Sequence, residues 1–284
     1  MLTNKNVSII GLGLIGGSIA KSFKKYLNPK NIYALTSNPE DITLAIEEGV
    51  ITKGYTDLEH EEILASDLIV LCTPVKMALE YLQKLSGKIK NNCIITDVCS
   101  TKGEMVSFVN SLPNPPLYVG GHPMAGKENS GYPFSSDTLL YDATYILTRA
   151  SSTDENTFSF VFDLIKGIGC KCVELNAKEQ DEATAVISHL PHIIAFTLVD
   201  FVREENKPIL KQLAAGGFKD ISRVASSDAN MWENIFITNK EAIHQVLSEY
   251  INKLKSFKDM IDNNMSEELK TLMINAKNFR NSIN

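Results

Sequence analysis

The chain has 284 residues, of which 44% are hydrophobic and 22% are charged. A chain of this length and composition can bury a sizeable core, has the usual size of two domains, and does not fall in the class of intrinsically disordered proteins. Its formal net charge of −6 argues against nucleic acid or an anionic membrane as the main partner. An anionic small-molecule substrate would therefore need local cations in its binding site.

Short β-branched runs alternate with amphipathic stretches over the first part of the chain. The predicted strands are 7–11, 32–35, 68–72, 93–97, 117–120, 144–147 and 171–175. The predicted helices between them are 15–26, 39–48, 75–85 and 155–168. This alternation is typical of βαβ units, and it predicts an α/β fold with a Rossmann-type, doubly wound, largely parallel sheet over residues 1–176.

The pattern changes after residue 176, where strand signals largely stop and long helical stretches begin. The predicted helices are 178–204, 208–213, 230–236, 240–262 and 266–278. We predict an all-helical domain over residues 177–284. Because its helices carry more apolar surface than one small bundle can hide, we expect this domain to form a homodimer.

Cysteine usage and apolar runs indicate the compartment. The five cysteines are an odd number without a secretory context, which indicates reduced thiols and a cytoplasmic protein. Cys170 and Cys172 have the spacing of half a zinc site, but no second pair follows, so we prefer alternating strand positions and predict no metal. Glycines interrupt the first apolar stretch and no other apolar run reaches membrane length, so we expect no membrane span.

A glycine motif directly follows the first predicted strand and opens a helix. Gly11 permits a tight turn, Gly13 lets the backbone approach a pyrophosphate, and Gly16 lets the helix pack closely on the strand. The helix start, with Leu14 and Ile15, would present free N–H groups to the phosphates. In this strand–turn–helix setting the motif predicts a dinucleotide site, and the alternative is a glycine-rich turn without a ligand.

The ends of two further strands supply candidate cofactor contacts. The carboxylate that usually ends the second strand and binds the ribose hydroxyl is absent, and Thr36 and Ser37 stand there instead. NAD is favoured because no positive clamp is present, but NADP stays possible because a lysine such as Lys53 could supply one in space. Thr73 and Pro74 end another strand, at the edge of the sheet where ligands bind.

His122 follows the predicted strand 117–120 and is flanked by glycines that give access to it. Oxidation of an alcohol by hydride transfer needs a group that holds or accepts the hydroxyl proton, and a histidine suits this task. The alternative is a turn histidine bonded to a backbone carbonyl.

Three groups in the helical region are candidates for substrate binding. His189 and His192 are three residues apart and share a helix face, and Pro191 between them should kink the helix and free a carbonyl. Surface histidines or a zinc site are the alternatives, although no third ligand is evident. Arg223 is the best carboxylate clamp among four arginines, or else a surface residue. Trp232, the single tryptophan, belongs either to the site or to the core.

Five stretches, in this order, resemble the prephenate dehydrogenase family. They are GLGLIGGS (11–18), DVCSTKGE (97–104), GGHPMAGKENSG (120–131), SHLPH (188–192) and GGFKDISRVASSDANMWENIF (216–236). The resemblance implies a Rossmann domain followed by a helical dimerisation domain. It also implies oxidative decarboxylation of prephenate to 4-hydroxyphenylpyruvate with NAD(P)⁺, on the route to tyrosine. No metal is required.

The resemblance also implies roles for individual residues. His122 is the catalytic histidine at the ring hydroxyl, Ser100 assists there, and Arg223 binds a substrate carboxylate. The residues that would line the remainder of the substrate pocket are His189, His192, Glu128 and Trp232. The role of Lys102 stays open.

Three alternatives to this function stay open. Arogenate dehydrogenase has the same chemistry with an amine in place of the side-chain ketone. Another Rossmann dehydrogenase, acting on a β-hydroxy acid, would carry a catalytic lysine in its helical domain. A non-catalytic dinucleotide sensor would bind cofactor without turnover. We also expect no regulatory domain after the helical domain.

Overall fold

The structure is a computed structural model that describes residues 2–127 and 129–283. It forms two compact units, Met1–Asn239 and Lys240–Asn284. The strands are β1 (Asn6–Ile10), β2 (Asn31–Leu35), β3 (Lys53–Tyr55), β4 (Leu68–Leu71), β5 (Ile94–Asp97), β6 (Leu117–Pro123), β7 (Thr144–Arg149) and β8 (Lys171–Glu174). The helices that flank them are α1 (Leu14–Ser22), α2 (Pro39–Glu47), α3 (Glu61–Leu64), α4 (Val75–Leu85), α5 (Gly103–Ser111) and α6 (Glu155–Gly167), with a π-helical turn η1 (Phe23–Leu27) and a 3₁₀ turn η2 (Tyr132–Phe134).

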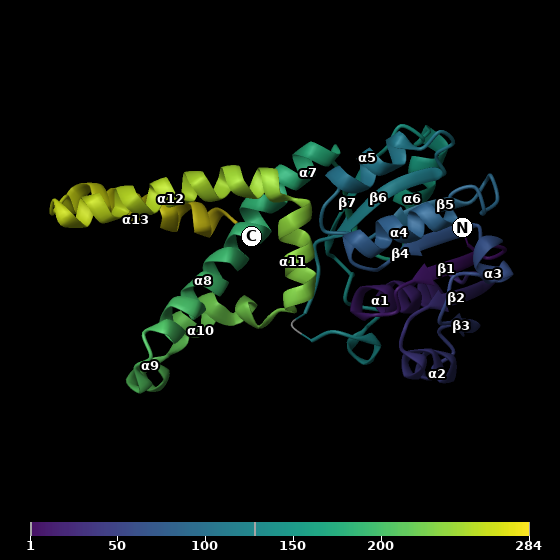
Figure 1. The fold of residues 1–284 in the computed structure, drawn as a ribbon, viewed down its shortest axis with the longest axis horizontal. Helices are drawn as coiled ribbons and strands as arrows, with labels where there is room; N and C mark the ends of the chain where they lie inside the picture. The colour runs from purple at the N-terminus through teal and green to yellow at the C-terminus, as the bar shows by residue number, and fades with distance from the viewer. Residues whose placement is uncertain (1, 128, 284) are drawn as a thin grey trace. The chain divides into compact units, whose positions relative to one another are not determined.

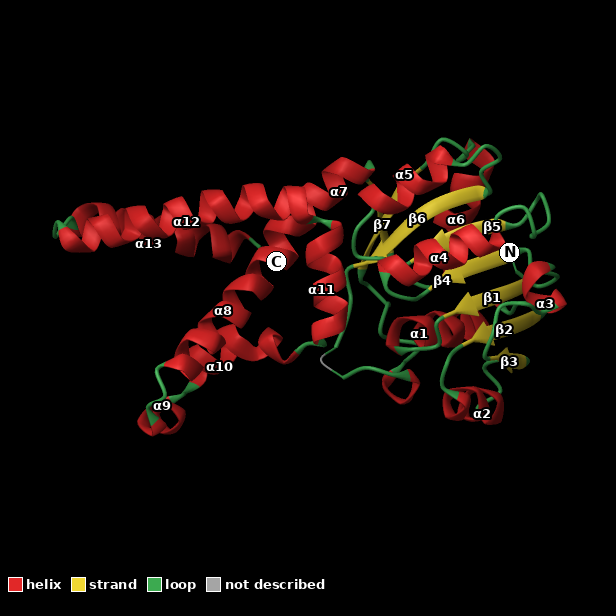
Figure 2. Cartoon of the chain, in the orientation of Figure 1, coloured by secondary structure: helices red, strands yellow, loops and turns green. Residues whose placement is uncertain are grey.

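The eight strands form one sheet in the order β3-β2-β1-β4-β5-β6-β7-β8 (Figures 1 and 2). All neighbours are parallel except β6 and β7, which pair antiparallel. The strand order reverses at β1, since β2 and β3 follow on one side of it and β4 to β8 on the other. Ligands bind at such a crossover in open α/β sheets.

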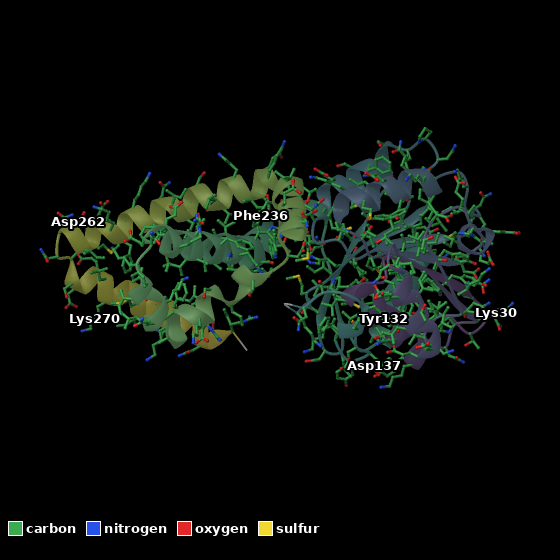
Figure 3. The ribbon with its side chains drawn as sticks, turned by 60° about the horizontal axis from the view of Figure 1, so that its bottom comes forward. Lys30, Tyr132, Asp137, Phe236, Asp262 and Lys270 are labelled. Carbon is green, nitrogen blue, oxygen red and sulfur yellow. The ribbon has the colours of Figure 1, made fainter. Side chains whose placement is uncertain are left out.

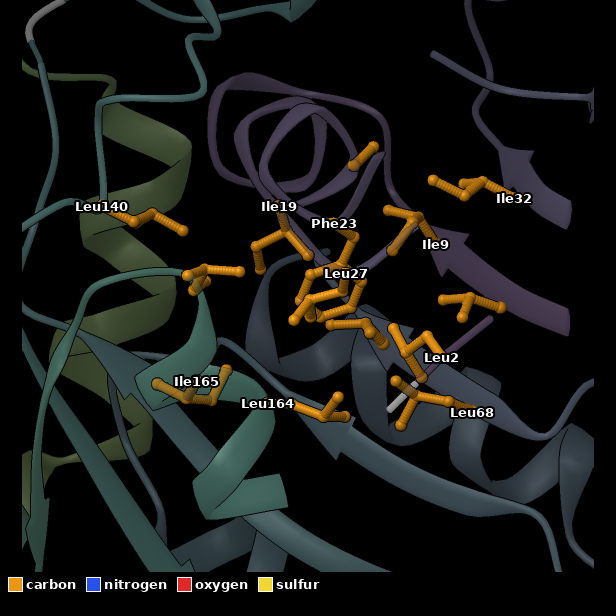
Figure 4. Packing of buried hydrophobic residues seen from close by; sticks show 14 of the residues in the cluster. Leu2, Ile9, Ile19, Phe23, Leu27, Ile32, Leu68, Leu140, Leu164 and Ile165 are labelled. Atoms are coloured by element: carbon orange, nitrogen blue, oxygen red, sulfur yellow. The ribbon is translucent and has the colours of Figure 1, made fainter. Parts of the chain in front are cut away.

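Two hydrophobic clusters cover the two faces of the sheet. The first packs α1 and α6 against the strands, with Ile19, Phe23, Leu164 and Ile165 among its members (Figure 4). The second packs α3, α4 and α5 on the opposite face. Because both faces are covered, the central strands are apolar throughout, as in the fully buried β4. The predicted Rossmann-type sheet is confirmed.

The long segment between β6 and β7 packs on α1 through its turn η2, and Figure 3 labels Tyr132 and Asp137 on this segment. The hydroxyl of Tyr132 donates to Glu48 at 2.7 Å, and Lys25 pairs with Asp137 at 2.6 Å. A Cβ atom at Gly17 would lie 2.7 Å from the Tyr132 ring, so a glycine is needed where this segment crosses α1. The segment is therefore fastened beside the helix that begins at the glycine motif.

The helical part of the first unit begins with one long helix, Ala177–Glu204. It consists of α7 (Ala177–Thr184), a π-helical turn η3 (Ala185–His189) and α8 (Leu190–Glu204). We predicted that Pro191 disrupts the helix, and the disruption is the π-helical turn η3, which lies just before it. Pro191 has no backbone N–H to donate to the preceding turn. The shorter helices that follow are α9 (Pro208–Leu213), α10 (Gly216–Ser222), the 3₁₀ turn η4 (Arg223–Ser226) and α11 (Ala229–Thr238).

The helix Ala177–Glu204 is long and apolar enough to cross a membrane by length and composition alone. The sequence interpretation that no run reaches membrane length was therefore wrong for this segment, because counting uninterrupted apolar residues misses a run broken by single polar ones. Only 17% of its most apolar window is buried within the structure. Val186, Ile187 and Phe201 are exposed on it.

The second unit is a pair of helices, α12 (Lys240–Asp262) and α13 (Ser266–Ser282), which pack on each other. Several large apolar side chains are exposed on this pair, including Leu254, Met273 and Phe279. The predicted helices of this region are confirmed, with α13 four residues longer than expected.

Some elements were missed or misplaced in the sequence interpretation. The strand β3 and the helices α3, α5 and α10 were not predicted. β3 and α3 are too short for a periodic signal, and α5 and α10 begin at glycines that read as loop. The strand β6 extends three residues beyond its predicted end.

Candidate active site

The glycine motif forms a tight turn between β1 and α1. Gly11 has φ of +101°, and a Cβ atom there would lie 2.6 Å from the carbonyl oxygen of Cys72. A Cβ atom at Gly16 would lie 1.9 Å from the carbonyl oxygen of Gly11, whereas one at Gly13 would meet nothing within 4 Å. The backbone at Gly13 is therefore open to a ligand, and α1 starts immediately after it at Leu14. Ile15 packs against the core.

The turn fits a dinucleotide. The first turn of α1 contains no acidic residue, so its N–H groups present an uncompensated positive dipole end to a phosphate. Thr73, at the end of β4, lies against the turn, with its methyl group 2.9 Å from the position of a Gly11 Cβ atom. The Thr73 hydroxyl is buried without a partner among the described residues, and Pro74 follows it as the N-cap of α4.

Thr36 and Ser37 follow β2, where a ribose-binding carboxylate is usual. The hydroxyl oxygen of Thr36 accepts from the backbone N–H of Asn38 at 3.4 Å, and Ser37 is exposed. Lys53 on the neighbouring β3 pairs with Glu62 at 2.8 Å, so its charge is already compensated. This arrangement gives a 2′-phosphate no dedicated clamp and favours NAD.

His122 lies inside β6, opposite Ile146 of β7. The prediction that it follows its strand was wrong, because the antiparallel pairing with β7 extends β6 to Pro123. The side chain is 7% exposed, and its Nδ1 atom is buried without a hydrogen-bond partner among the described residues. The alternative of a ring bonded through Nδ1 to a backbone carbonyl is therefore not observed. The pKa of His122 is lowered to about 3, mainly by burial and to a smaller extent by the nearby Lys102 and His189.

A fully buried ion pair lies beside His122. Lys102 Nζ donates to Asp97 Oδ1 at 2.7 Å, to the carbonyl of Cys99 at 2.8 Å and to the carbonyl of Thr101 at 3.2 Å. Asp97 Oδ2 accepts a hydrogen bond from the Tyr118 hydroxyl. It also accepts one, at 3.4 Å, from the backbone N–H of Gly121, the residue before His122. A buried charge pair of this kind is tolerated because every donor of the ammonium group has an acceptor.

This ion pair positions Ser100 relative to His122. The two carbonyls that Lys102 binds belong to the residues on either side of Ser100, which lies on the loop between β5 and α5 and is partly exposed. The Asp97 carboxylate binds the N–H of Gly121 in β6. The loop of Ser100 and the strand of His122 are thus joined through one pair of buried charges.

His189 and His192 contribute from the helix that follows the sheet. His189 is 1% exposed, so the surface alternative is wrong for it, and burial lowers its pKa to about 4. His192 is half-buried and stacks on Trp232 with ring centroids 3.6 Å apart. Trp232 also meets the edge of His189 at 6.0 Å and carries a buried Nε1 without a partner among the described residues.

Arg223 begins the turn η4, which packs against α8. Its side chain is exposed, and its charge contributes to the lowered pKa of His192, which is due mainly to burial. Arg223 therefore lies near the histidine and tryptophan cluster. Glu128, the remaining predicted pocket residue, lies outside the described residues.

Sequence reasoning missed several polar residues of this region. Asp181 accepts the backbone N–H groups of Lys102 and Gly103 at 2.7 and 2.8 Å, and so caps the start of α5. Asn239 donates to the backbone carbonyl of Asp181 at 2.8 Å and contacts His189. No spacing rule could have identified them, because their partners lie 50 to 79 residues away.

Nothing in the described part of the chain brings together three or more His, Cys, Asp or Glu side chains that could hold a metal ion. The site consists instead of an open backbone turn, a cluster of buried histidines, one buried lysine–aspartate pair and a nearby arginine. Such a combination suits a dinucleotide and an anionic substrate that gives up a proton.

Comparisons with known proteins identify the family of the chain. The model of the prephenate dehydrogenase nucleotide-binding domain matches residues 19–174, and that of the prephenate dehydrogenase dimerization domain matches residues 176–275. A prephenate dehydrogenase of Bacillus subtilis is 35% identical over 281 residues, which cover 98% of this chain and 76% of that protein.

Two solved structures have the same fold over nearly the whole chain. The crystal structure of prephenate dehydrogenase from A. aeolicus in complex with hydroxyphenyl propionate and NAD⁺ has a TM-score of 0.93 and 35% identity, covering 100% of this chain and 99% of that one. The crystal structure of Synechocystis arogenate dehydrogenase has a TM-score of 0.83 and 26% identity, covering 97% of this chain and 99% of that one. With the models of both domains matched over most of its length, the chain belongs to the prephenate dehydrogenase family.

Proposed function

We propose that His122, assisted by Ser100, accepts the hydroxyl proton of the substrate, and that Arg223 binds a substrate carboxylate. The chain is an NAD-dependent prephenate dehydrogenase, an oxidoreductase of tyrosine biosynthesis. The observation that carries the assignment of residues is the buried His122, neutral at physiological pH and with a ring nitrogen that no described residue occupies.

The reaction divides into tasks that suit these groups. Bound NAD⁺ supplies the acceptor for the hydride that leaves the ring carbon bearing the hydroxyl. His122 takes the hydroxyl proton as the ketone forms. When the ring carboxylate leaves as CO₂, its bonding electron pair makes the ring aromatic and leaves a phenolate oxygen, which takes the proton back from His122 to give 4-hydroxyphenylpyruvate. Because aromatisation drives the reaction, the protein has mainly to orient the reactants and stabilise charge. The carboxylates of the substrate raise the basicity of His122 when they bind, which offsets the effect of Lys102.

The half-buried ring of His192 and the buried rings of Trp232 and His189 support a pocket wall for the substrate ring. An aromatic wall beside histidines suits a planar, carboxylate-bearing ligand. We include Glu128 in this pocket on the resemblance alone. For the cofactor we propose contacts from Gly11, Gly13, Leu14, Ile15 and Gly16 in the turn, Thr36 and Ser37 after β2, and Thr73 and Pro74 after β4.

We propose a functional division between a dinucleotide-binding region, 1–176, and a helical substrate and dimerisation region, 177–284. The exposed apolar side chains of Ala177–Glu204 and of α12 and α13 support a homodimer through the helical region of a cytoplasmic protein. Sedimentation equilibrium at micromolar concentration tests this proposal. A dimer is expected, and a monomer would contradict it.

The substrate test is reduction of NAD⁺ followed by absorbance of the reduced cofactor, with prephenate and arogenate compared in parallel and NADP⁺ in place of NAD⁺. We expect rapid turnover with prephenate and NAD⁺. Turnover with arogenate alone would assign the sister activity. Binding of NAD⁺ without turnover of either substrate would identify a dinucleotide sensor.

A further inference from the structure

Asn239 links the buried His189 to the loop that carries Ser100. The residue follows α11, and its side chain is 5% exposed. Its Nδ2 atom lies 2.8 Å from the backbone carbonyl oxygen of Asp181 and 3.1 Å from Nδ1 of His189. Asp181 in turn caps the start of α5 through its carboxylate, so the position of its backbone is fixed from both sides.

These two contacts determine which ring nitrogen of His189 carries the proton. A carbonyl oxygen can only accept, so the amide group facing Asp181 must be the NH₂ and not the oxygen. An amide NH₂ can only donate, so its second hydrogen points to Nδ1 of His189, which must offer a lone pair. In a neutral imidazole the single proton is then on Nε2.

The Nε2 atom of His189 is buried and has no hydrogen-bond partner in the described residues. The ring stays neutral near pH 7, because burial lowers the pKa of His189 to about 4. Its surroundings are those of the candidate active site, since the Trp232 ring lies beside it and a charge on His189 would lower the pKa of His122. A buried N–H donor without an acceptor is costly and is found where a ligand supplies the acceptor.

We propose that Asn239 is a positioning residue that fixes His189 as an Nε2–H donor to an acceptor oxygen of the bound substrate. The inference rests on the proposed function for the identity of that substrate. It separates the roles of the two buried histidines: His189 has its lone pair occupied by Asn239 and donates, so it cannot serve as the base, whereas His122 keeps a free nitrogen to accept a proton.

The tautomer can be measured without activity. The full chain labelled with ¹⁵N-histidine contains five histidines, and a two-bond ¹H–¹⁵N correlation spectrum distinguishes protonated from unprotonated ring nitrogens. His189→Asn assigns the signal. His192 is an internal reference, because its Nδ1 donates to the carbonyl of Ser188 at 2.9 Å and it must therefore be the opposite tautomer. We expect an unprotonated Nδ1 and a protonated Nε2 for His189. A protonated Nδ1 would overturn the proposal.

Asn239→Ala tests the consequence for binding. It should leave His189 as a mixture of tautomers and raise KM for the substrate about fivefold to tenfold, the scale of one neutral hydrogen bond, with KM for NAD⁺ unchanged. The matched control is Asn234→Ala on α11, whose amide donates, among the described residues, to Asn230 and Glu233 of the same helix. An unchanged tautomer and substrate KM in folded Asn239→Ala would overturn the proposal. Should the wild type turn over neither substrate, the proposed function fails, while the spectrum still decides the tautomer.

Discussion

The two halves of the candidate site are built in opposite ways. At the glycine turn the backbone forms the site, and what matters is the absence of side chains at Gly11, Gly13 and Gly16. At the substrate half, side chains form the site, and each is held by others from distant parts of the chain. His122 lies on β6, Lys102 on the loop before α5, and His189 on η3.

The difference shows where each half is vulnerable. A backbone site fails when an atom is added, because space for the ligand or for the turn itself is lost. A buried side-chain site fails when an atom is removed or a proton moves, because a partner is left buried and unsatisfied. Substitutions that add or remove atoms in each half therefore test the comparison.

The largest effect is expected from His122→Asn. An asparagine keeps polarity and approximate size but cannot accept the hydroxyl proton, so turnover should fall roughly 10²- to 10⁴-fold, the usual scale for a general base. Steady-state kinetics with prephenate and NAD⁺ measures this effect. His244→Asn on the exposed face of α12 is the matched control and should leave turnover unchanged. Near-normal turnover in His122→Asn would remove His122 from the mechanism.

Arg223→Ala should act on substrate binding. Loss of a charge-assisted contact to a carboxylate should raise KM for prephenate by about 10- to 100-fold, or about 1.5–3 kcal/mol. Arg223→Lys keeps the charge but not the bidentate geometry, so its KM should lie between those of the wild type and the alanine variant. An unchanged KM in Arg223→Ala would show that the substrate carboxylate is bound elsewhere.

The glycine turn can be tested by two additions of a single methyl group. At Gly13 the added atom meets no protein atom within 4 Å, so Gly13→Ala should fold normally and weaken NAD⁺ about tenfold, or about 1.4 kcal/mol. At Gly16 it would lie 1.9 Å from a backbone oxygen, so Gly16→Ala should lower the melting temperature as well. Calorimetry and NAD⁺ titration separate the two. Equal NAD⁺ affinity in Gly13→Ala and the wild type would refute a pyrophosphate at this turn.

The same contrast explains what the sequence could predict. The turn at Gly11 is local, so its spacing alone indicated a strand, a turn and a helix, and β1 and α1 are where the motif requires them. The Lys102–Asp97 pair is close in sequence, yet nothing in the sequence indicates that both are fully buried. Asp181 and Asn239 were invisible because their partners depend on how the helices pack on the sheet.

The smallest effect concerns the pH dependence of stability. The pKa of His189 falls from an unfolded value of about 6.5 to about 4 in the folded chain because of burial. Between these values the unfolded state binds a proton that the folded state does not, so the free energy of unfolding falls as the pH falls, and it levels off below the folded pKa. Protonation of His189 alone should lower the free energy of unfolding by about 1 kcal/mol as the pH falls from about 6 to about 5.

His189→Asn removes this proton, so its free energy of unfolding should fall by about 1 kcal/mol less over that interval than that of the wild type. Urea titrations at the two pH values measure the difference, and comparing slopes cancels any loss of stability that is the same at both. His244→Asn, at an exposed position, should run parallel to the wild type. If His189→Asn also ran parallel, His189 would be as protonated in the folded chain as in the unfolded chain between about pH 5 and pH 6. Both of its ring nitrogens would then donate at these pH values, and the distinction between a donating His189 and an accepting His122 would be lost there.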